Sequence, residues 1–276
     1  LTTKPDKVQL ESNTFNAVCD FLALGIDPEK STFWVQSDLP QVTELSWILS
    51  SFANVSMMDR STSYKDKISQ GLNPNMGLYS YPILMASDIL LYDSEIVPVG
   101  KDQKQHLEIA RDIASKFNRY FGEVLKLPKP EIESSNQLIP GIDGQKMSKS
   151  YNNMINIFLD DKKLRKQIMS IKTDSTNIED PKDYNSCNVF NLYKLLANKN
   201  QVTELKSKYV NGGYGYGNAK QELFELICIN YKSQREMFMH LIQNPKIIEQ
   251  ELKEGAKKAR EIAKDVLVRV RKNVGY

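Results

Sequence analysis

The sequence is poor in the residues that build disulfide frameworks, metal centres and membrane spans. Among 276 residues there are three cysteines. Cys19, Cys187 and Cys228 are far apart and form no CxxC pair, which argues against a disulfide framework or a zinc site. We therefore expect a reducing, cytoplasmic location and no metal bound tightly by protein side chains. The longest apolar stretch, residues 81–92, is interrupted by Asp88, so we expect no membrane span and no signal peptide.

Neither sign of charge is in large excess. The chain has 37 Lys and Arg against 34 Asp and Glu, a net charge of +3, which is too small to indicate a nucleic-acid binder by itself. With 41% hydrophobic and 26% charged residues, the composition is typical of a folded globular protein. The length suits one large domain or two of ordinary size.

The first half of the chain alternates helix and strand patterns. Residues 5–24 carry an apolar stripe at helical spacing, residues 32–36 form a compact aromatic and β-branched run typical of a buried strand, and a second helix is expected through residue 49. This rhythm predicts an α/β fold, a Rossmann-like doubly wound parallel sheet.

A second strand pattern, residues 96–100, runs directly into an expected helix over residues 103–121. Asp102 and Gln105 have the spacing of a capping box at the start of that helix. A Pro-containing extended stretch follows at residues 128–130.

Beyond residue 150 strand patterns disappear and an all-helical domain is expected. The helical patterns cover residues 160–169, 187–196, 218–241 and 245–272. We place a Rossmann-like domain at 1–152, a helical domain at 153–255, and a C-terminal helix at 256–276 that packs back on the first domain.

The sharpest signal is the pentamer KMSKS at residues 146–150, which follows a glycine-containing stretch at 141–144. Lysine offers a compact cation suited to phosphate, and serine hydroxyls with backbone N–H groups add donors around an anion. A solvated polar loop is the alternative interpretation of such a pentamer.

KMSKS is the signature of class I aminoacyl-tRNA synthetases. The runs YPILMASDIL at 81–90 and VPVGKDQKQH at 97–106 resemble bacterial-type tryptophanyl-tRNA synthetases. The resemblance extends to GIDP at 25–28, YKDK at 64–67 and TDS at 173–175. It implies activation of L-tryptophan with ATP and Mg²⁺, transfer to the terminal adenosine of tRNA(Trp), and a homodimer. It also implies that residues 1–152 are the catalytic domain, without its first βα unit, and that the helical domain at 153–255 binds the tRNA and its anticodon.

Three side chains on one helix face are candidates for the amino-acid pocket. Tyr81, Met85 and Asp88 fall within about 60° of one another around a helix. Asp88 is either a structural carboxylate bonded to a neighbouring backbone group or lysine, or the acceptor for the indole N–H of tryptophan. In the resembled family these three positions line the amino-acid pocket. The other tryptophan contacts that we expect are Gln103, which would reach the α-amino group, Val97 and Val99.

The resemblance also implies the nucleotide site. Gly100 and Asp102 would hold the ribose of ATP, although Asp102 as a simple helix cap is the alternative. Lys146 and Lys149 would neutralise charge on the departing pyrophosphate, and Lys67 is a second-rank catalytic candidate that is otherwise a solvated surface charge. The other expected ATP contacts are Lys101, Ile139, Met147, Ser148 and Ser150.

Two further features have plain interpretations beside functional ones. We interpret His106 as structural, because a carboxylate nucleophile needs no general base. The basic run after Asp160 is either a solvated face or a surface that follows an RNA backbone; it comprises Lys162, Lys163, Arg165 and Lys166.

The sequence departs from the family at its start. Members open with a strand–loop–helix unit that bears a Pro-Thr/Ser-Gly turn and a HIGH-like signature, and neither motif occurs here. We expect that roughly 30 or more residues of a longer protein precede Leu1; a chain that truly began there would be severely impaired in activation. The competing functions are a non-catalytic RNA-binding module and the activation of tyrosine or another adenylyl transfer.

Overall fold

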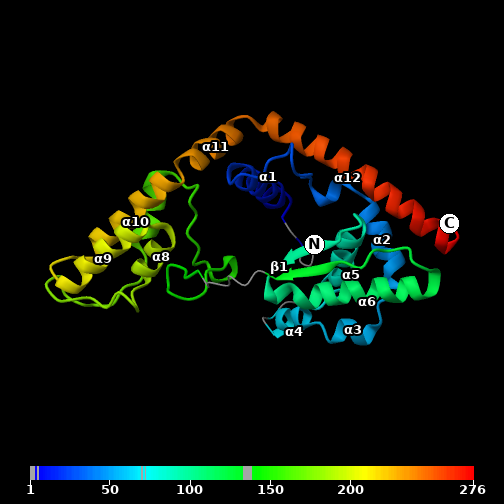
Figure 1. Ribbon diagram of the computed structural model, residues 1–276, viewed down its shortest axis with the longest axis horizontal. Helices are drawn as coiled ribbons and strands as arrows, with labels where there is room; N and C mark the ends of the chain where they lie inside the picture. The colour runs from blue at the N-terminus through cyan, green and yellow to red at the C-terminus, as the bar shows by residue number, and fades with distance from the viewer. Residues whose placement is uncertain (1–3, 5, 70, 72, 133–138) are drawn as a thin grey trace. The chain divides into compact units, whose positions relative to one another are not determined.

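The computed structural model describes residues 4, 6–69, 71, 73–132 and 139–276, without the side chains of residues 62, 63, 66, 67, 102 and 150. The chain forms two compact units, each with its own hydrophobic core (Figure 1). The first unit comprises Leu1–Val18, Ile26–Asn136 and Pro245–Tyr276, and the second comprises Cys19–Gly25 and Gln137–Asn244. Helix α1 (Lys7–Ala23) contributes residues to both.

The first unit contains a parallel β-sheet, which within the described residues has two strands. Strands β1 (Ile96–Val99) and β2 (Lys129–Ile132) pair in parallel, with Ile96 opposite Lys129. Helix α6 (Lys104–Phe121) connects them, so this part of the chain is a βαβ unit. The carboxyl end of β1 is therefore the edge at which such sheets bind ligands.

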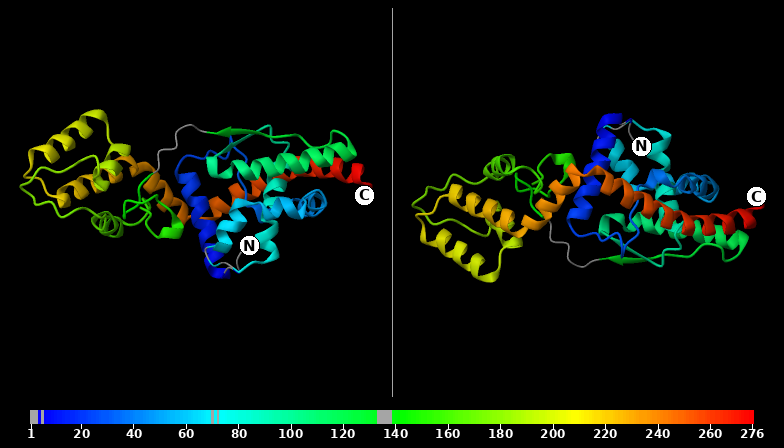
Figure 2. Two further views of the ribbon diagram at one scale, coloured as in Figure 1. Left: turned by 90° about the horizontal axis from the view of Figure 1, so that it is seen from below. Right: turned by 90° about the horizontal axis from the view of Figure 1, so that it is seen from above.

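Helices from distant parts of the sequence build the core of the first unit. They are α2 (Gln41–Ser50), α5 (Met76–Leu90), α6 and α12 (Pro245–Val274), which contribute buried side chains to one cluster and are seen from two further sides in Figure 2. Two short helices, α3 (Val55–Asp59) and α4 (Thr62–Ser69), lie between α2 and α5 in the sequence. Fully buried side chains of this core include Leu45, Leu49, Leu90, Ile113, Phe117, Ala259 and Val270.

Helix α12 holds the segment before α2 through a glycine and an arginine. Gly255 sits so close to the backbone of Phe33 that a Cβ atom there would overlap the Phe33 carbonyl oxygen. One turn further on, Arg260 donates a hydrogen bond to the Asp38 carbonyl over 3.0 Å. The short 3-10 helix η1 (Gln36–Asp38) is thus fixed at its end by contacts with the C-terminal helix.

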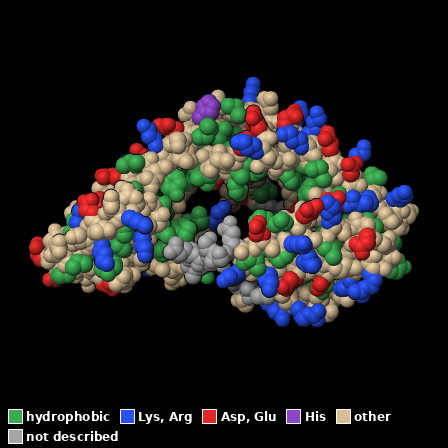
Figure 3. Space-filling model, viewed as in Figure 1, with side chains coloured by type: hydrophobic (Ala, Val, Ile, Leu, Met, Phe, Trp, Pro, Cys, Tyr) green, Lys and Arg blue, Asp and Glu red, His purple; other side chains and the backbone are tan. Residues whose placement is uncertain are grey.

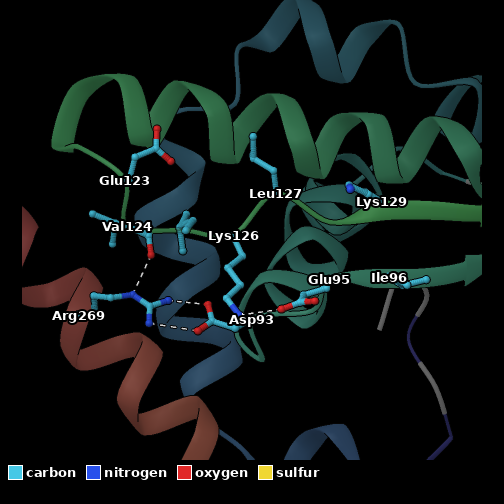
Figure 4. A pocket seen from close by; sticks show the side chains of 10 residues that line it. Asp93, Glu95, Ile96, Glu123, Val124, Lys126, Leu127, Lys129 and Arg269 are labelled. Carbon is cyan, nitrogen blue, oxygen red and sulfur yellow. Dashed lines mark hydrogen bonds and ion pairs between the residues drawn. The ribbon is translucent and has the colours of Figure 1, made fainter.

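The other end of α12 is tied to the loops that lead into the two strands. The Arg269 guanidinium bonds both oxygens of Asp93, at 2.5 and 3.1 Å, and the Val124 carbonyl at 2.8 Å (Figure 4). Nearby, Lys126 pairs with Glu95 over 3.2 Å. These pairs line a cavity of about 700 Å³ at the amino ends of β1 and β2, the end opposite the expected ligand edge. Among the charged residues that line this cavity, Arg269 and Asp93 hold α12, and Lys126 and Glu95 pair with each other.

The second unit is helical around its own core. Its helices are α7 (Asp161–Met169), α8 (Asn188–Leu196), α9 (Lys199–Asn211), α10 (Tyr216–Asn230) and α11 (Lys232–Gln243). Local sequence explains their starts: Asp160 caps α7 through the Lys163 N–H, and Asn198 with Gln201 forms a capping box on α9. Buried side chains of this core include Leu164, Ile168, Val189, Phe190, Tyr209 and Leu223.

The α/β fold with a parallel sheet and a large helical part confirms the predicted fold class. The predicted strand at residues 32–36 is wrong: residues 32–35 have no ladder partner in the described part, and Gln36 begins η1. An extended, apolar run becomes a strand only beside a hydrogen-bonding neighbour. The helix predicted over 218–241 is two helices that meet at Tyr231, and α3, α4 and α9 were not predicted.

The compact units do not follow the expected domain boundaries residue by residue. Residues 137–152 belong to the helical unit, and α12 belongs to the first unit from Pro245 onward. The functional domain boundaries stay a prediction.

We expect Gly255→Ala to lower the free energy of unfolding by about 2 kcal/mol or more, because the new methyl group meets a backbone oxygen that cannot rotate away. Chemical denaturation followed by circular dichroism measures this change. Gly217→Ala is the matched control: this helical glycine has open space around it, so the variant should be unchanged or slightly more stable. Equal stability of Gly255→Ala and wild type would contradict the packing described above.

Candidate functional site

Helix α5 presents the three predicted amino-acid-pocket residues on one face. Asn75 caps the helix by accepting a hydrogen bond from the Leu78 N–H, and the following residues keep the helical phase. Tyr81, Met85 and Asp88 are all half-buried rather than sealed in the core. A face of this kind combines an aromatic ring, a thioether and a carboxylate at a partly open surface, which suits an aromatic ligand that carries a donor.

The Asp88 carboxylate has a neutral hydrogen-bond partner. The Gln36 side-chain amide of η1 donates to Asp88 Oδ2. Burial raises the pKa of Asp88, and the Gln36 bond acts in the opposite direction. Sequence reasoning did not identify Gln36, because it was assigned to a strand and lies 52 positions from Asp88.

Aromatic side chains lie beside this carboxylate. Burial, followed by the charge of Asp88, raises the pKa of Tyr92 to about 12. The Trp34 and Tyr92 rings meet edge to face with centroids 5.0 Å apart. Elsewhere on α5, the Tyr81 hydroxyl and His106 Nε2 are 2.9 Å apart, and His106 is buried. The histidine is therefore engaged in orienting the Tyr81 phenol.

The carboxyl end of β1 leads into an exposed glycine. Val97 and Val99 are half-buried and alternate with exposed residues, and Gly100 is exposed with extended backbone angles of φ −68° and ψ 161°. The Gln103 N–H donates to the Gly100 carbonyl over 3.0 Å, which closes the 3-10 helix η2 (Lys101–Gln103). Lys101 is exposed and Gln103 is half-buried.

The predicted capping box at Asp102 and Gln105 depends on the Asp102 side chain and so lies outside the described residues. Helix α6 begins at Lys104, its N-cap is Gln103, and the cap residue makes no side-chain capping bond. The intervening 3-10 turn takes up the residues that the spacing assigned to the helix start. The Asp102 side chain lies outside the described residues, as do the side chains of Lys67 on α4 and Ser150.

The lysine-rich pentamer lies on a tight loop of the second unit. Pro140 and Lys146 form an antiparallel bridge, and the Met147 N–H donates to the Ile139 carbonyl over 2.8 Å. Lys146 and Lys149 are exposed, as is Ile139, while Met147 and Ser148 are half-buried. Two lysine side chains thus project into solvent from a backbone that is itself hydrogen-bonded.

A single buried asparagine organises this loop. Asn153 is 2% exposed; its side-chain oxygen accepts from the Ser148 N–H at 2.8 Å, and its amide nitrogen donates to the Lys146 carbonyl at 3.0 Å. The same nitrogen donates to Asp143 Oδ1 at 2.8 Å, and this bond lowers the pKa of Asp143. The Asn153 side-chain amide therefore hydrogen-bonds to the backbone on both sides of Met147. Only its position three residues beyond KMSKS could have drawn attention to Asn153.

Two further contacts attach the loop to its surroundings. A Cβ at Gly141 would overlap the Asn153 side chain, and the Asn188 amide of α8 donates to the Gly141 carbonyl over 2.7 Å. On α1, burial raises the pKa of Asp20, and the positive charge of Lys149 partly offsets that effect. The Lys149 ammonium is thus within electrostatic range of a carboxylate.

The basic run on α7 is exposed. Lys163 pairs with Asp160 at 3.0 Å, and Arg165 donates to Gln221 at 2.8 Å. In the view of Figure 3, basic and acidic side chains are interspersed over both units, in keeping with the small net charge. The possibility that this face follows RNA stays a prediction.

The described part of the chain shows neither a metal-binding cluster nor a membrane-spanning helix. It contains no cluster of three or more His, Cys, Asp or Glu side chains suited to a metal ion. None of its helices combines the length and the apolar character that crossing a bilayer requires.

The predicted site residues form two sets. The Tyr81, Met85 and Asp88 face belongs with the end of β1 to the first unit, and the KMSKS loop belongs to the second. The first set combines a carboxylate that has aromatic neighbours with the carboxyl end of a parallel strand, and the second supplies exposed cations on an anchored loop.

Comparison with known proteins agrees with these features. Residues 1–231 match the family described as tRNA synthetases class I (W and Y). The tryptophan–tRNA ligase of Campylobacter jejuni strain RM1221 is 48% identical over 275 residues, covering 100% of this chain and 86% of that protein. The enzyme of Fusobacterium nucleatum is 49% identical over 276 residues, covering 100% and 85%. A crystal structure of C. jejuni tryptophanyl-tRNA synthetase complexed with ADP and tryptophan superposes with a TM-score of 0.96 at 48% identity, covering 100% and 86%.

We expect Asn153→Ala to loosen the KMSKS loop, because the Ser148 N–H and the Lys146 carbonyl lose their shared partner. Hydrogen–deuterium exchange should be about tenfold faster at the Ser148 amide. Asn211→Ala, at an exposed helix end of the same unit, is the control and should leave that amide unchanged. Wild-type protection at Ser148 in Asn153→Ala would contradict the assigned role.

Proposed function

Because this chain belongs to the class I tRNA synthetase family of the tryptophan and tyrosine enzymes, we propose that it is a tryptophan–tRNA ligase. The observation that carries this conclusion is the 48–49% identity to tryptophan–tRNA ligases along the whole chain. The structural likeness to a synthetase complexed with ADP and tryptophan supports ATP and tryptophan as the small substrates.

The first step joins tryptophan to adenylate. The carboxylate of tryptophan attacks the α-phosphorus of ATP, the bond to the bridging oxygen breaks, and pyrophosphate leaves with its electron pair. No general base is needed, because the nucleophile is already ionised. Catalysis then rests on positioning and on stabilisation of the charge that develops on the leaving phosphates.

The roles of individual residues follow from their chemistry. Lys146 and Lys149 would neutralise the departing pyrophosphate, and their exposed ammonium groups support that role. ATP enters as its Mg²⁺ complex, so this metal arrives with the substrate. Ile139, Met147, Ser148 and Ser150 would complete the loop side of the ATP site. Gly100, Lys101 and Asp102 would hold the nucleotide at the end of β1, and Lys67 would act near the triphosphate.

The amino-acid pocket follows the same logic. Tyr81 and Met85 would bracket the indole ring, and Asp88 would accept its N–H. Val97 and Val99 would provide apolar walls, and Gln103 would reach the α-amino group. A phenol can also donate to a carboxylate, so the shape of the pocket must exclude tyrosine.

In the second step a ribose hydroxyl of the terminal adenosine of tRNA(Trp) attacks the mixed anhydride, and AMP leaves. We propose that the helical unit contacts the tRNA, that two copies of the chain form a homodimer, and that the enzyme acts in the cytoplasm, where tRNA is charged.

ATP–pyrophosphate exchange with single amino acids tests the function. We expect exchange with tryptophan and less than about one-hundredth of that rate with tyrosine, in keeping with a pocket built around an indole. Exchange with tyrosine instead would contradict the assignment. Exchange with neither would favour a non-catalytic RNA-binding module.

We expect Lys149→Ala to lower the rate of pyrophosphate exchange by about 100-fold or more, since one cation that faces the developing charge is lost. Tryptophan affinity, measured by equilibrium dialysis, should change less than about twofold because the amino-acid pocket is untouched. Lys199→Ala, an exposed lysine on α9, is the control and should keep wild-type exchange. Wild-type exchange in Lys149→Ala would refute the role of this lysine.

A further inference from the structure

The hydrogen-bond donor to Asp88 is the neutral side-chain amide of Gln36, and a purely structural role would not require a neutral donor. Asp88 lies on a helix face among apolar neighbours, where a carboxylate without a donor is costly. A lysine or arginine would meet that need most strongly and would also neutralise the charge. The chain instead places a neutral amide donor there, so the hydrogen bond is satisfied while the negative charge remains.

The bond engages one carboxylate oxygen. Gln36 Nε2 donates to Oδ2 of Asp88. A carboxylate accepts at two oxygens, so Oδ1 keeps its capacity for a second donor. Asp88 is half-buried on the same face as Tyr81 and Met85, so a ligand bound on that face can reach its carboxylate.

The backbone that carries Gln36 is fixed from outside the pocket. Gly255 of α12 packs against the Phe33 carbonyl, and Arg260 bonds the Asp38 carbonyl at the end of η1. Between these two anchors, Trp34 packs edge to face on Tyr92. The amide of Gln36 is therefore presented to Asp88 from a segment that is held on both sides.

We propose that Gln36 is a positioning and specificity residue that holds the Asp88 carboxylate ionised and turned so that its second oxygen accepts the ring N–H of the substrate. This inference rests on the proposed function and adds a residue to it. Gln36 itself does not touch the reacting atoms. Its effect should appear only for a substrate whose ring carries an N–H donor.

The same hydrogen bond also has an electrostatic effect on Asp88. Burial raises the pKa of Asp88, whereas the Gln36 hydrogen bond lowers it. A protonated carboxyl group would be a weaker acceptor than a carboxylate and would itself donate a hydrogen bond. The amide thus favours the form of Asp88 that accepts from an indole.

The test compares two substrates that differ in this donor. In β-(3-benzothienyl)alanine a sulfur atom replaces the indole N–H, with little change in ring shape. Gln36→Met keeps the length of the side chain and removes its donor. We expect the KM for tryptophan in pyrophosphate exchange to rise about tenfold or more, with kcat nearly unchanged, while the KM for the benzothienyl analogue changes less than about twofold.

Gln36→Leu provides a second variant with the same expected selectivity, should the methionine variant fold poorly. Gln250→Leu, an exposed glutamine on α12, is the matched control and should behave as wild type with both substrates. Thermal unfolding of each variant checks that the fold is retained.

Each other outcome overturns the inference. Equal losses for tryptophan and the analogue would mean that Gln36 only shapes the pocket. An unchanged KM for tryptophan would mean that Asp88 needs no such partner. Failure of the wild-type protein to exchange with tryptophan would instead refute the proposed function and the inference with it, so the two failures are told apart by the wild-type assay.

Discussion

The candidate amino-acid site of the first unit depends on how the fold keeps a carboxylate on a largely apolar helix. Asp88 is half-buried on α5, and desolvation disfavours its ionised form. A neutral donor, Gln36, offsets part of that penalty without cancelling the charge. A charge kept in this way is available to a ligand, whereas a salt bridge would have consumed it. The neighbouring rings of Trp34 and Tyr92 then define the surroundings in which that charge acts.

This arrangement links the two ends of the chain. The segment that bears Gln36 pairs with no strand among the described residues, and α12 holds it from more than two hundred positions away. The same helix binds Asp93 through Arg269 and Glu44 through Arg271, whose Nε lies 2.5 Å from the carboxylate. A helix with no predicted site residue therefore stabilises the segment that bears Gln36 and the loop that leads into β1. In the second unit, Asn153 has the corresponding task for the lysine loop.

The sequence was sufficient where local pattern decides the structure. Helical spacing placed Tyr81, Met85 and Asp88 on one face, and the strand pattern at 96–100 predicted β1. It was insufficient where tertiary contacts decide: the run at 32–36 resembles a strand but ends in η1, and a 3-10 turn displaces the start of α6 to Lys104. Gln36 and Asn153 escaped prediction because their roles consist of hydrogen bonds to particular partners, which no periodicity encodes. Resemblance to a family identified site residues but not the side chains that orient them.

The account is tested most directly by a crystal structure of the protein with bound tryptophan. It predicts that the indole nitrogen lies within about 2.7–3.2 Å of Asp88 Oδ1 while the Gln36 amide remains on Oδ2. An indole nitrogen directed away from Asp88, or a carboxylate that contacts Gln36 alone in the complex, would contradict it.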